Sequence, residues 1–284
     1  MNPIINNAWP VVLSVAGYDP SAGAGIVADL KTFAAHNCYG VAAITALTIQ
    51  NSQGVAAVHP VDPTILRESI LSVLADGRVK ALKIGMLGNF AAAGVVREIL
   101  ESNPDIPAVL DPVLHSSNDF SLLDAEGLDF MRRELLSRVT VITPNLAEAA
   151  ALAEIPVDNL ENMKAAARKL VELGARAVVV TGGHLDKAID VFFDGTTMES
   201  FVGERIKPDN THGTGCTFSS AVAANLALGR HLRDAVVLAK AYVVEAIRQA
   251  FPVGPGRIPL NHLYRMTQPA RLTDHSPAVA ETTR

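Results

Sequence analysis

Residues 11–25 read Val-Val-Leu-Ser-Val-Ala-Gly-Tyr-Asp-Pro-Ser-Ala-Gly-Ala-Gly, and this stretch decides the fold. The apolar run Val11–Ala16 predicts a short buried strand, and the Gly-rich segment after it predicts a tight turn. Apolar side chains then recur at helical spacing, at Ile26, Leu30, Phe33 and Ala34. A strand, a Gly-rich turn and a helix form half of a βαβ unit, so this stretch indicates a parallel sheet covered by helices.

The same alternation of strands and helices continues along the chain. Apolar runs predict further strands at Val41–Leu47, Val55–His59, Ala81–Ile84, Ala108–Leu110, Val139–Ile142 and Ala177–Val180, and a hairpin of Ile189–Phe193 with Met198–Val202. Helical spacing predicts helices from Pro63 to about Leu74 and at Ala91–Leu100, Ala147–Ala153, Met163–Leu173, Thr214–Leu228 and Leu232–Gln249. We therefore predict an α/β fold with a central, mostly parallel β-sheet flanked by helices on both faces. Residues 1–267 form a single domain in this prediction, and residues 268–284 form a disordered C-terminal tail because they lack hydrophobic periodicity.

Composition and charge exclude several classes of protein. The chain has 284 residues, of which 49% are hydrophobic, and a formal net charge of −5 without a basic run, so neither nucleic acid nor an anionic membrane is an expected partner. No apolar run reaches membrane-spanning length, and Met1–Trp9 lacks the pattern of a signal peptide. The two cysteines, Cys38 and Cys216, do not predict a disulfide framework and fit a reducing, cytoplasmic location.

Polar or Gly-rich stretches follow most of the predicted strands. They are Asp19–Gly25, Gln50-Asn51, Met86, Asp111, Asn145–Glu148 and Gly182-Gly183. The carboxyl ends of parallel strands lie at one edge of a sheet, and ligands of such sheets bind there. The sequence therefore predicts that these stretches converge on one active site.

A second Gly-rich turn, Thr211–Thr217, runs directly into a predicted helix. The first turn of a helix directs unpaired backbone N–H groups and the positive end of the helix dipole at one place, which suits a phosphate. Cys216 lies in this first turn, where the pKa of its thiol is expected to fall. An ordinary helix start with glycines and a buried cysteine explains the same residues, and this stretch alone does not decide between the two.

Taken in chain order, these motifs resemble the hydroxymethylpyrimidine/phosphomethylpyrimidine kinases of thiamin synthesis, which are members of the ribokinase-like superfamily. The matching segments are Ala16–Ile26, Ala28–Phe33, Thr45–Leu47, Gln50-Asn51, Lys83–Leu87, Asp111–Val113, Thr143–Ala149, Gly182–His184 and Thr211–Thr217. The resemblance implies a ribokinase-like fold and a kinase that uses ATP and Mg²⁺ to phosphorylate a small pyrimidine. It also implies a cytoplasmic homodimer.

The resemblance assigns the pyrimidine site to Gly17, Asp29, Gln50, Met86 and Val113. The carboxamide of Gln50 agrees with this role, because it offers a donor and an acceptor side by side to an aminopyrimidine edge. Without the resemblance, Gln50 is equally well explained as a strand-end amide, Asp29 as a solvated helix carboxylate and Met86 as core filler.

The same comparison assigns catalytic roles around the second Gly-rich turn. Cys216 matches the residue that takes the proton of the substrate hydroxyl, and a thiolate at a helix start is a plausible base. The backbone around Gly213, Thr214 and Gly215 matches the donors that hold the charge developing on the transferred phosphoryl group. His212 receives no role.

The nucleotide side of the site is assigned to Asn145, Thr181 and Gly183, and Glu148 is assigned to Mg²⁺. A carboxylate three residues after Asn145 at a helix start suits a hard cation. The alternative is a capping box, in which Asn145 and Glu148 only satisfy the start of a helix. Thr181 and Gly183 are equally compatible with a plain turn.

Two positions depart from the family pattern, since Ser117 and Thr181 stand where lysine is usual. Segment His115–Ser121 is expected to hang over the site as a mobile flap. Without the flap lysine, we expect weaker binding of the pyrimidine monophosphate, or else specialisation for one of the two phosphorylation steps. A pyridoxine/pyridoxal kinase and a non-catalytic pyrimidine- or nucleotide-binding sensor remain alternative functions.

Overall fold

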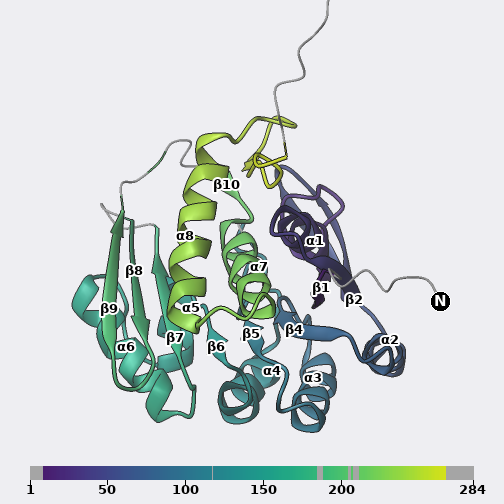
Figure 1. The fold of residues 1–284 in the computed structure, drawn as a ribbon, viewed down its shortest axis with the longest axis horizontal. Coiled ribbons are helices and arrows are strands. Elements are labelled where there is room, and N and C mark those ends of the chain that lie inside the picture. Colours follow the sequence, from purple (N-terminus) through teal and green to yellow (C-terminus); the bar gives the residue numbers. More distant parts are fainter. Residues whose placement is uncertain (1–8, 117, 184–187, 204–205, 207–210, 267–284) are drawn as a thin grey trace, which may run out of the picture.

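A computed structural model of the chain describes residues 9–116, 118–183, 188–203, 206 and 211–266. A nine-stranded sheet forms its centre (Figure 1), with strand order β3-β2-β1-β4-β5-β6-β7-β8-β9. The strands are β1 (Val11–Tyr18), β2 (Tyr39–Asn51), β3 (Gly54–Pro60), β4 (Val79–Ile84), β5 (Ala108–Leu110), β6 (Val141–Ile142), β7 (Val178–Gly182), β8 (Ala188–Phe193) and β9 (Met198–Gly203). Strands β2, β1, β4, β5, β6 and β7 run parallel, whereas β3 and the β8–β9 hairpin add antiparallel edges.

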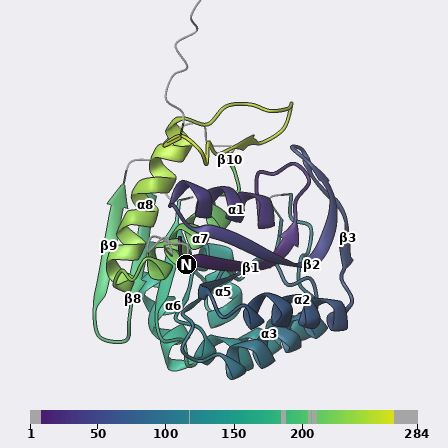
Figure 2. The same ribbon diagram turned by 45° about the vertical axis from the view of Figure 1, so that its right-hand side comes forward.

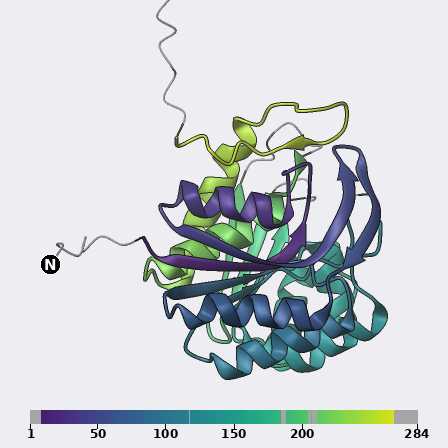
Figure 3. The same cartoon turned by 90° about the vertical axis from the view of Figure 1, so that its right-hand side faces the viewer.

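Helices cover both faces of this sheet (Figures 2 and 3). They are α1 (Gly25–Ala35), α2 (Pro63–Ala75), α3 (Phe90–Ser102), α4 (Ala125–Phe130), α5 (Leu146–Ala153), α6 (Leu160–Glu172), α7 (Thr214–Ala227) and α8 (Leu232–Arg248). Helices α1, α7 and α8 pack on one face, and α2, α3, α5 and α6 pack on the other. Two short strands, β10 (Thr211–His212) and β11 (Ile258–Pro259), pair separately beside the start of α7.

Alternation along the parallel strands explains the two layers of core. Successive side chains of a strand point to opposite faces, so a strand buried on both faces is apolar throughout. Val12, Ala81, Val109 and Val141 pack under α1, α7 and α8. Leu13, Leu82, Leu110 and Ile142 pack under the helices of the other face. Each such buried aliphatic side chain contributes about 1.5–3 kcal/mol to folding.

The predicted fold class is confirmed, and the structure changes several boundaries. Strand β2 extends to Asn51, so Gln50 lies inside a strand rather than after it. Segment 125–138, for which no helix is predicted, forms α4, a π-helical turn and a 3₁₀ turn. In the part of the chain that the structure describes, no helix combines the length and apolar character needed to cross a membrane. The predicted tail at 268–284 lies outside the described residues.

Candidate active site

A cavity of about 640 Å³ opens at the carboxyl ends of the parallel strands. This volume is typical of a site for a small molecule or cofactor. The polar stretches predicted to converge do meet here, and the wall includes Gly17, Gln50, Met86, Val113, Asn145, Glu148, Thr181, Gly183, Gly213, Thr214, Gly215 and Cys216. Asp29 is the one residue assigned to the site from the sequence that is absent from this wall.

The two Gly-rich turns meet at the cavity, and each starts a helix that no side chain caps. Helix α7 begins after Gly213, whose φ is 85°, and a Cβ on this residue would lie 1.8 Å from the backbone O of Gly23. Helix α1 begins after Ala24, again without a capping side chain. Helices α2 to α6 are each capped by an Asp or Asn, and α8, whose start does not line the cavity, also lacks a cap. The helix starts at the cavity therefore keep first-turn N–H groups for an anion.

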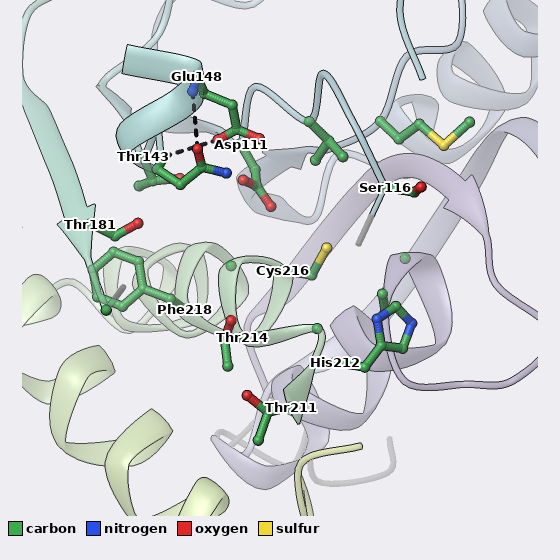
Figure 4. A pocket seen from close by; sticks show the side chains of 18 of the residues that line it. Asp111, Ser116, Thr143, Glu148, Thr181, Thr211, His212, Thr214, Cys216 and Phe218 are labelled. Carbon is green, nitrogen blue, oxygen red and sulfur yellow. Dashed lines mark hydrogen bonds between the residues drawn. The ribbon is translucent and has the colours of Figure 1, made fainter. Parts of the chain in front are cut away.

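Cys216 lies between these two helix starts, half-buried and facing the cavity (Figure 4). Burial raises the pKa of its thiol to about 12, and the carboxylates of Asp111 and Asp29 add to this effect. The ammonium group of Lys83 and the Gly25 N–H oppose the rise without cancelling it. The prediction that the helix start lowers this pKa is therefore wrong, because burial and two negative charges outweigh one cation and the helix amides.

A buried ion pair adjoins Cys216. The side chains of Lys83 on β4 and Asp29 on α1 are both 0% exposed, and Lys83 Nζ lies 3.0 Å from Asp29 Oδ2. Lys83 Nζ also lies 4.0 Å from Asp111 Oδ2, at the end of β5. Burial lowers the pKa of Lys83, but the Asp29 carboxylate more than compensates, so this pKa lies above its usual value. Burial raises the pKa of Asp111 against the pull of Lys83.

The assignment of Asp29 to the pyrimidine needs correction, because its side chain does not reach the cavity. Its carboxylate accepts hydrogen bonds from Ser14 Oγ and Ser220 Oγ, each at 2.6 Å, as well as from Lys83. The alternative of a solvated helix carboxylate is also wrong, since three donors satisfy this carboxylate in the core. Asp29 holds Lys83 in place behind the cavity wall.

Glu148 and Asn145 form a capping box at the start of α5. Asn145 Oδ1 accepts from the Glu148 N–H, and Glu148 Oε2 accepts from the Asn145 N–H, both at 2.9 Å. The capping alternative is therefore confirmed, but Glu148 also lines the cavity. Burial, and then the charge of Asp111, raise the pKa of Glu148 to about 8. Figure 4 shows Glu148 and Asp111 in the same part of the cavity.

These two carboxylates fit a particular kind of metal site. Among the described residues, no group of three or more His, Cys, Asp and Glu side chains could hold a metal ion. Mg²⁺ takes only one or two carboxylates from a protein and completes its shell with phosphate oxygens and water. Glu148 and Asp111 therefore suit Mg²⁺ that arrives with a nucleotide rather than a resident metal.

The other end of the cavity combines an apolar wall with polar side chains, of which Gln50 is one. Met86 is 7% exposed and packs with Ala46 and Leu122, beside Val113. A Cβ on Gly17 would lie 2.9 Å from Met86 Sδ, so glycine lets this side chain approach β1. A flat heteroaromatic ring with one hydrogen-bonding edge suits this combination.

The segment after β5, which is expected from the sequence to form a flap, lines this end of the cavity. His115 pairs with Ser121 as an antiparallel bridge, and His115 lines the cavity. Asn118 joins the flap to β3, because its Oδ1 accepts from the Val55 N–H at 3.1 Å and its Nδ2 donates to Val55 O at 3.2 Å. Ser117, where the family lysine is missing, lies outside the described residues.

Thr181 and Gly183 lie at the end of β7, on the side of the cavity formed by β8 and α8. Asp190 on β8 accepts from the Gly182 N–H at 3.1 Å and from Lys240 Nζ at 2.6 Å. Asp190 is the strand partner of Thr181, and its pairing with Lys240 leaves no net charge at this point of the wall. The apolar part of this wall consists of Phe218, Val243, Val244 and Ile247.

The sequence reasoning gave no role to several charged or titratable residues of this wall, among them Asp19, Lys83, His212 and Lys240. Lys83 has a local signal, because it interrupts the apolar run Ala81–Ile84 and a charge in a buried strand requires a partner. Asp19 and His212 are 193 positions apart, and no local pattern relates them.

Comparison with known proteins shows which family the sequence matches. The sequence matches the family described as phosphomethylpyrimidine kinase over residues 19–261. A hydroxymethylpyrimidine/phosphomethylpyrimidine kinase from Aquifex aeolicus is 41% identical over 248 residues, which cover 87% of this chain and 97% of the relative. The ADP complex of Bacillus subtilis pyridoxal kinase has a TM-score of 0.83 at 37% identity and covers 91% of this chain and 99% of its own. A phosphomethylpyrimidine kinase from Clostridium difficile 630 has a TM-score of 0.75 at 36% identity, with coverages of 84% and 99%.

Proposed function

The chain belongs to the phosphomethylpyrimidine kinase family, and we propose that it phosphorylates 4-amino-5-hydroxymethyl-2-methylpyrimidine, its monophosphate or both, using ATP. Phosphorylation of the alcohol gives the monophosphate, and phosphorylation of the monophosphate gives the pyrimidine diphosphate for thiamin synthesis. The observation that carries this proposal is the pair of uncapped helix starts that enclose Cys216, at a cavity that also holds Gln50. An anion site and a heteroaromatic site in one cavity are what transfer of a phosphoryl group to a small pyrimidine requires.

The similar pyridoxal kinase is an ADP complex, which supports the use of ATP. ATP would take the side of the cavity that Thr181, Gly183 and Asn145 line. The first-turn amides of α7, at Thr214 and Gly215, would hold the charge that develops on the γ-phosphoryl group. Glu148 would hold Mg²⁺, which neutralises phosphate charge when bound.

The raised pKa of Cys216 changes the proton route expected from the sequence. A thiol with a pKa of about 12 is protonated at neutral pH, so it does not act alone as a base. It does donate a hydrogen bond to Asp111, which Lys83 holds at 4.0 Å. We infer a relay in which the substrate O–H proton passes to Sγ while the S–H proton passes to Asp111. The freed oxygen lone pair attacks the γ-phosphorus, and ADP leaves.

A pyridoxal kinase on the same scaffold is the second candidate. The TM-score of 0.83 to the Bacillus subtilis pyridoxal kinase favours it. The family match and the relative from Aquifex aeolicus favour the pyrimidine instead. A sensor that binds without catalysis needs no proton route, so the Cys216–Asp111 pair speaks against it.

Steady-state ADP release tests these candidates directly. The panel contains the hydroxymethylpyrimidine, its monophosphate, pyridoxine and pyridoxal, each with ATP and Mg²⁺. We expect the highest kcat/KM with one of the two pyrimidines. A higher kcat/KM with pyridoxal would make the pyridoxal kinase the better-supported function. Binding without ADP release would favour the sensor. A homodimer in the cytoplasm remains part of the proposal, and sedimentation equilibrium checks the dimer.

Substitution of Glu148 by Gln tests the metal role. We expect Glu148→Gln to need more Mg²⁺ for half-maximal activity at fixed ATP, because the anionic ligand is lost while the cap can remain. Without Mg²⁺, we expect the same substitution to stabilise the protein, although it impairs activity. The pKa of Glu148 is about 8 in the folded protein against 4.5 for the free side chain, so the folded state keeps a proton that the unfolded chain releases. Wild-type stability therefore falls as pH rises through this window.

Gln does not titrate, so without Mg²⁺ the Tm of the variant should exceed that of the wild type increasingly towards pH 8. Each kcal/mol corresponds to a difference of about 2–4 °C. Glu172→Gln on the exposed surface of α6 is the control, with no change in either measurement. If the Mg²⁺ titrations of Glu148→Gln and the wild type overlay, Glu148 is a helix cap and no more.

A further inference from the structure

A group of three polar side chains joins the two Gly-rich turns to the pyrimidine end of the cavity. His212 lies directly before Gly213, and its Nε2 lies 2.9 Å from Asp19 Oδ2, in the first Gly-rich turn. The same Nε2 lies 3.1 Å from Gln50 Nε2 on β2. All three side chains line the cavity, and the relay between Cys216 and Asp111 uses none of them.

The hydrogen count on His212 Nε2 permits only one arrangement. Asp19 Oδ2 is a carboxylate oxygen that only accepts, so Nε2 must carry a proton to bond it. If the Gln50 amide also turned its NH₂ group towards Nε2, two donors would face each other. Turning the carboxamide by 180° keeps its shape and brings Oε1 to His212, where it shares the Nε2 proton with Asp19.

The partner on the other side of Gln50 agrees with this orientation. Before this turn of the carboxamide, Thr48 Oγ1 lies 3.1 Å from Gln50 Oε1, and it lies 2.9 Å from the backbone O of Tyr18. The hydroxyl hydrogen of Thr48 goes to Tyr18 O, because a carbonyl only accepts. Thr48 Oγ1 therefore accepts from Gln50, which requires the NH₂ group on that side. Every group in the network then has a partner of the right kind.

Packing holds this network rigidly. Asp19 is 3% exposed and accepts from Ser21 N at 2.8 Å, Ser21 Oγ at 2.6 Å and Ala24 N at 2.9 Å. Burial raises the pKa of Asp19, but the His212 hydrogen bond and the other donors lower it further, so Asp19 stays ionised. A Cβ on Gly23 would lie 2.4 Å from His212 Cδ2, so the imidazole ring packs directly on the turn.

We propose that His212 and Asp19 are positioning residues that fix the carboxamide of Gln50 in one orientation, and that this orientation selects a 4-aminopyrimidine over a 4-oxopyrimidine. His212 and Thr48 take the lateral lone pair and the lateral N–H of Gln50. One lone pair of Oε1 and one N–H of Nε2 remain for the substrate. The acceptor lies on the His212 side and the donor on the Thr48 side. An amino group and its neighbouring ring nitrogen match this order, whereas an oxo group and its neighbouring N–H need the reverse. This selection deepens the proposed function and rests on it.

The test compares kcat/KM for the hydroxymethylpyrimidine with that for its 4-oxo analogue. We expect the wild type to prefer the amino compound by about 100-fold, because the wrong edge leaves two buried groups mismatched. His212→Leu frees Gln50 to turn, so the preference should fall by about 10-fold, largely through gain on the oxo compound. His212→Gln retains a terminal donor and should restore most of the preference. His59→Leu, at an exposed position of β3 outside the cavity wall, is the control and should leave the preference unchanged.

Equal losses on both compounds in His212→Leu, with an unchanged ratio, would overturn the proposal and leave His212 a structural role. ¹⁵N NMR of the ligand-free protein decides the hydrogen count independently of any reaction. A proton on His212 Nε2 at neutral pH supports the network, and a bare Nε2 overturns it. If the wild type phosphorylates neither pyrimidine, the proposed function fails, and the NMR result still decides whether His212 orients Gln50.

Discussion

Replacement of Cys216 by Ala is expected to lower kcat by about 10²–10⁴ and to leave the Kd of the pyrimidine nearly unchanged. The variant breaks the proton route between the substrate hydroxyl and Asp111, while the helix amides and Gln50 stay in place. Single-turnover kinetics give the chemical step, and calorimetry gives the Kd. A normal kcat in Cys216→Ala would remove the thiol from the mechanism.

Two further variants separate a relay from a simple base. Cys216→Asp puts a carboxylate where the thiol stands, so it should recover part of the activity lost in Cys216→Ala. Asp111→Asn removes the final acceptor but keeps the shape, and we expect a loss of kcat comparable to that of Cys216→Ala. If Asp111→Asn keeps normal kcat at saturating Mg²⁺, the proton ends elsewhere and the relay is wrong.

Substitution of Lys83 by Met is expected to destabilise the protein by about 3–5 kcal/mol, because the carboxylate of Asp29 is then buried without its cation. In a chain of this size, that loss corresponds to a fall in Tm of about 10 °C. Asp111 also loses its nearest ammonium group, at 4.0 Å, so kcat should fall with the stability. Calorimetric or denaturant unfolding in the absence of ligands measures the effect.

Lys80→Met is the matched control, because Lys80 lies on the same strand with an exposed side chain. It should change stability by less than about 0.5 kcal/mol. The double variant Lys83→Met with Asp29→Asn should be more stable than Lys83→Met alone. The neutral Asn replaces the buried carboxylate that Lys83→Met leaves without its cation. Equal stabilities of Lys83→Met and Lys80→Met would show that the ion pair contributes nothing to folding.

The fold could be predicted from the sequence because each parallel strand is buried on both faces. A strand of this kind is a short apolar run ending in a turn, and the strand predicted at Ala108–Leu110 has the bounds observed for β5. The sequence did not predict helix in segment 125–138. There the hydrogen-bond pattern changes from α to π to 3₁₀, so apolar side chains recur at no single period.

The sequence motifs predicted which segments form the candidate site, but they did not predict the protonation state of its titratable groups. Gly-rich turns and strand-end polar residues mark its wall, because the topology of a parallel sheet brings them to one edge. The pKa of Cys216 depends instead on burial and on the charges of Lys83, Asp111 and Asp29, which come from different elements. Their distances are set by packing between β4, β5 and α1, and no local pattern encodes them. The role given to Asp29 failed for the same reason.

The contact of Gly213 with Gly23 also has a consequence for motion. The backbones of the two Gly-rich turns touch where neither residue has room for a Cβ, and the Asp19–His212 hydrogen bond joins the same turns. Neither turn has space to shift while the other stays in place. Segments 17–25 and 211–216, far apart in sequence, should therefore open as one cooperative unit. Their backbone amides should exchange hydrogen with the same opening free energy, and a ligand held by one turn should slow exchange in both.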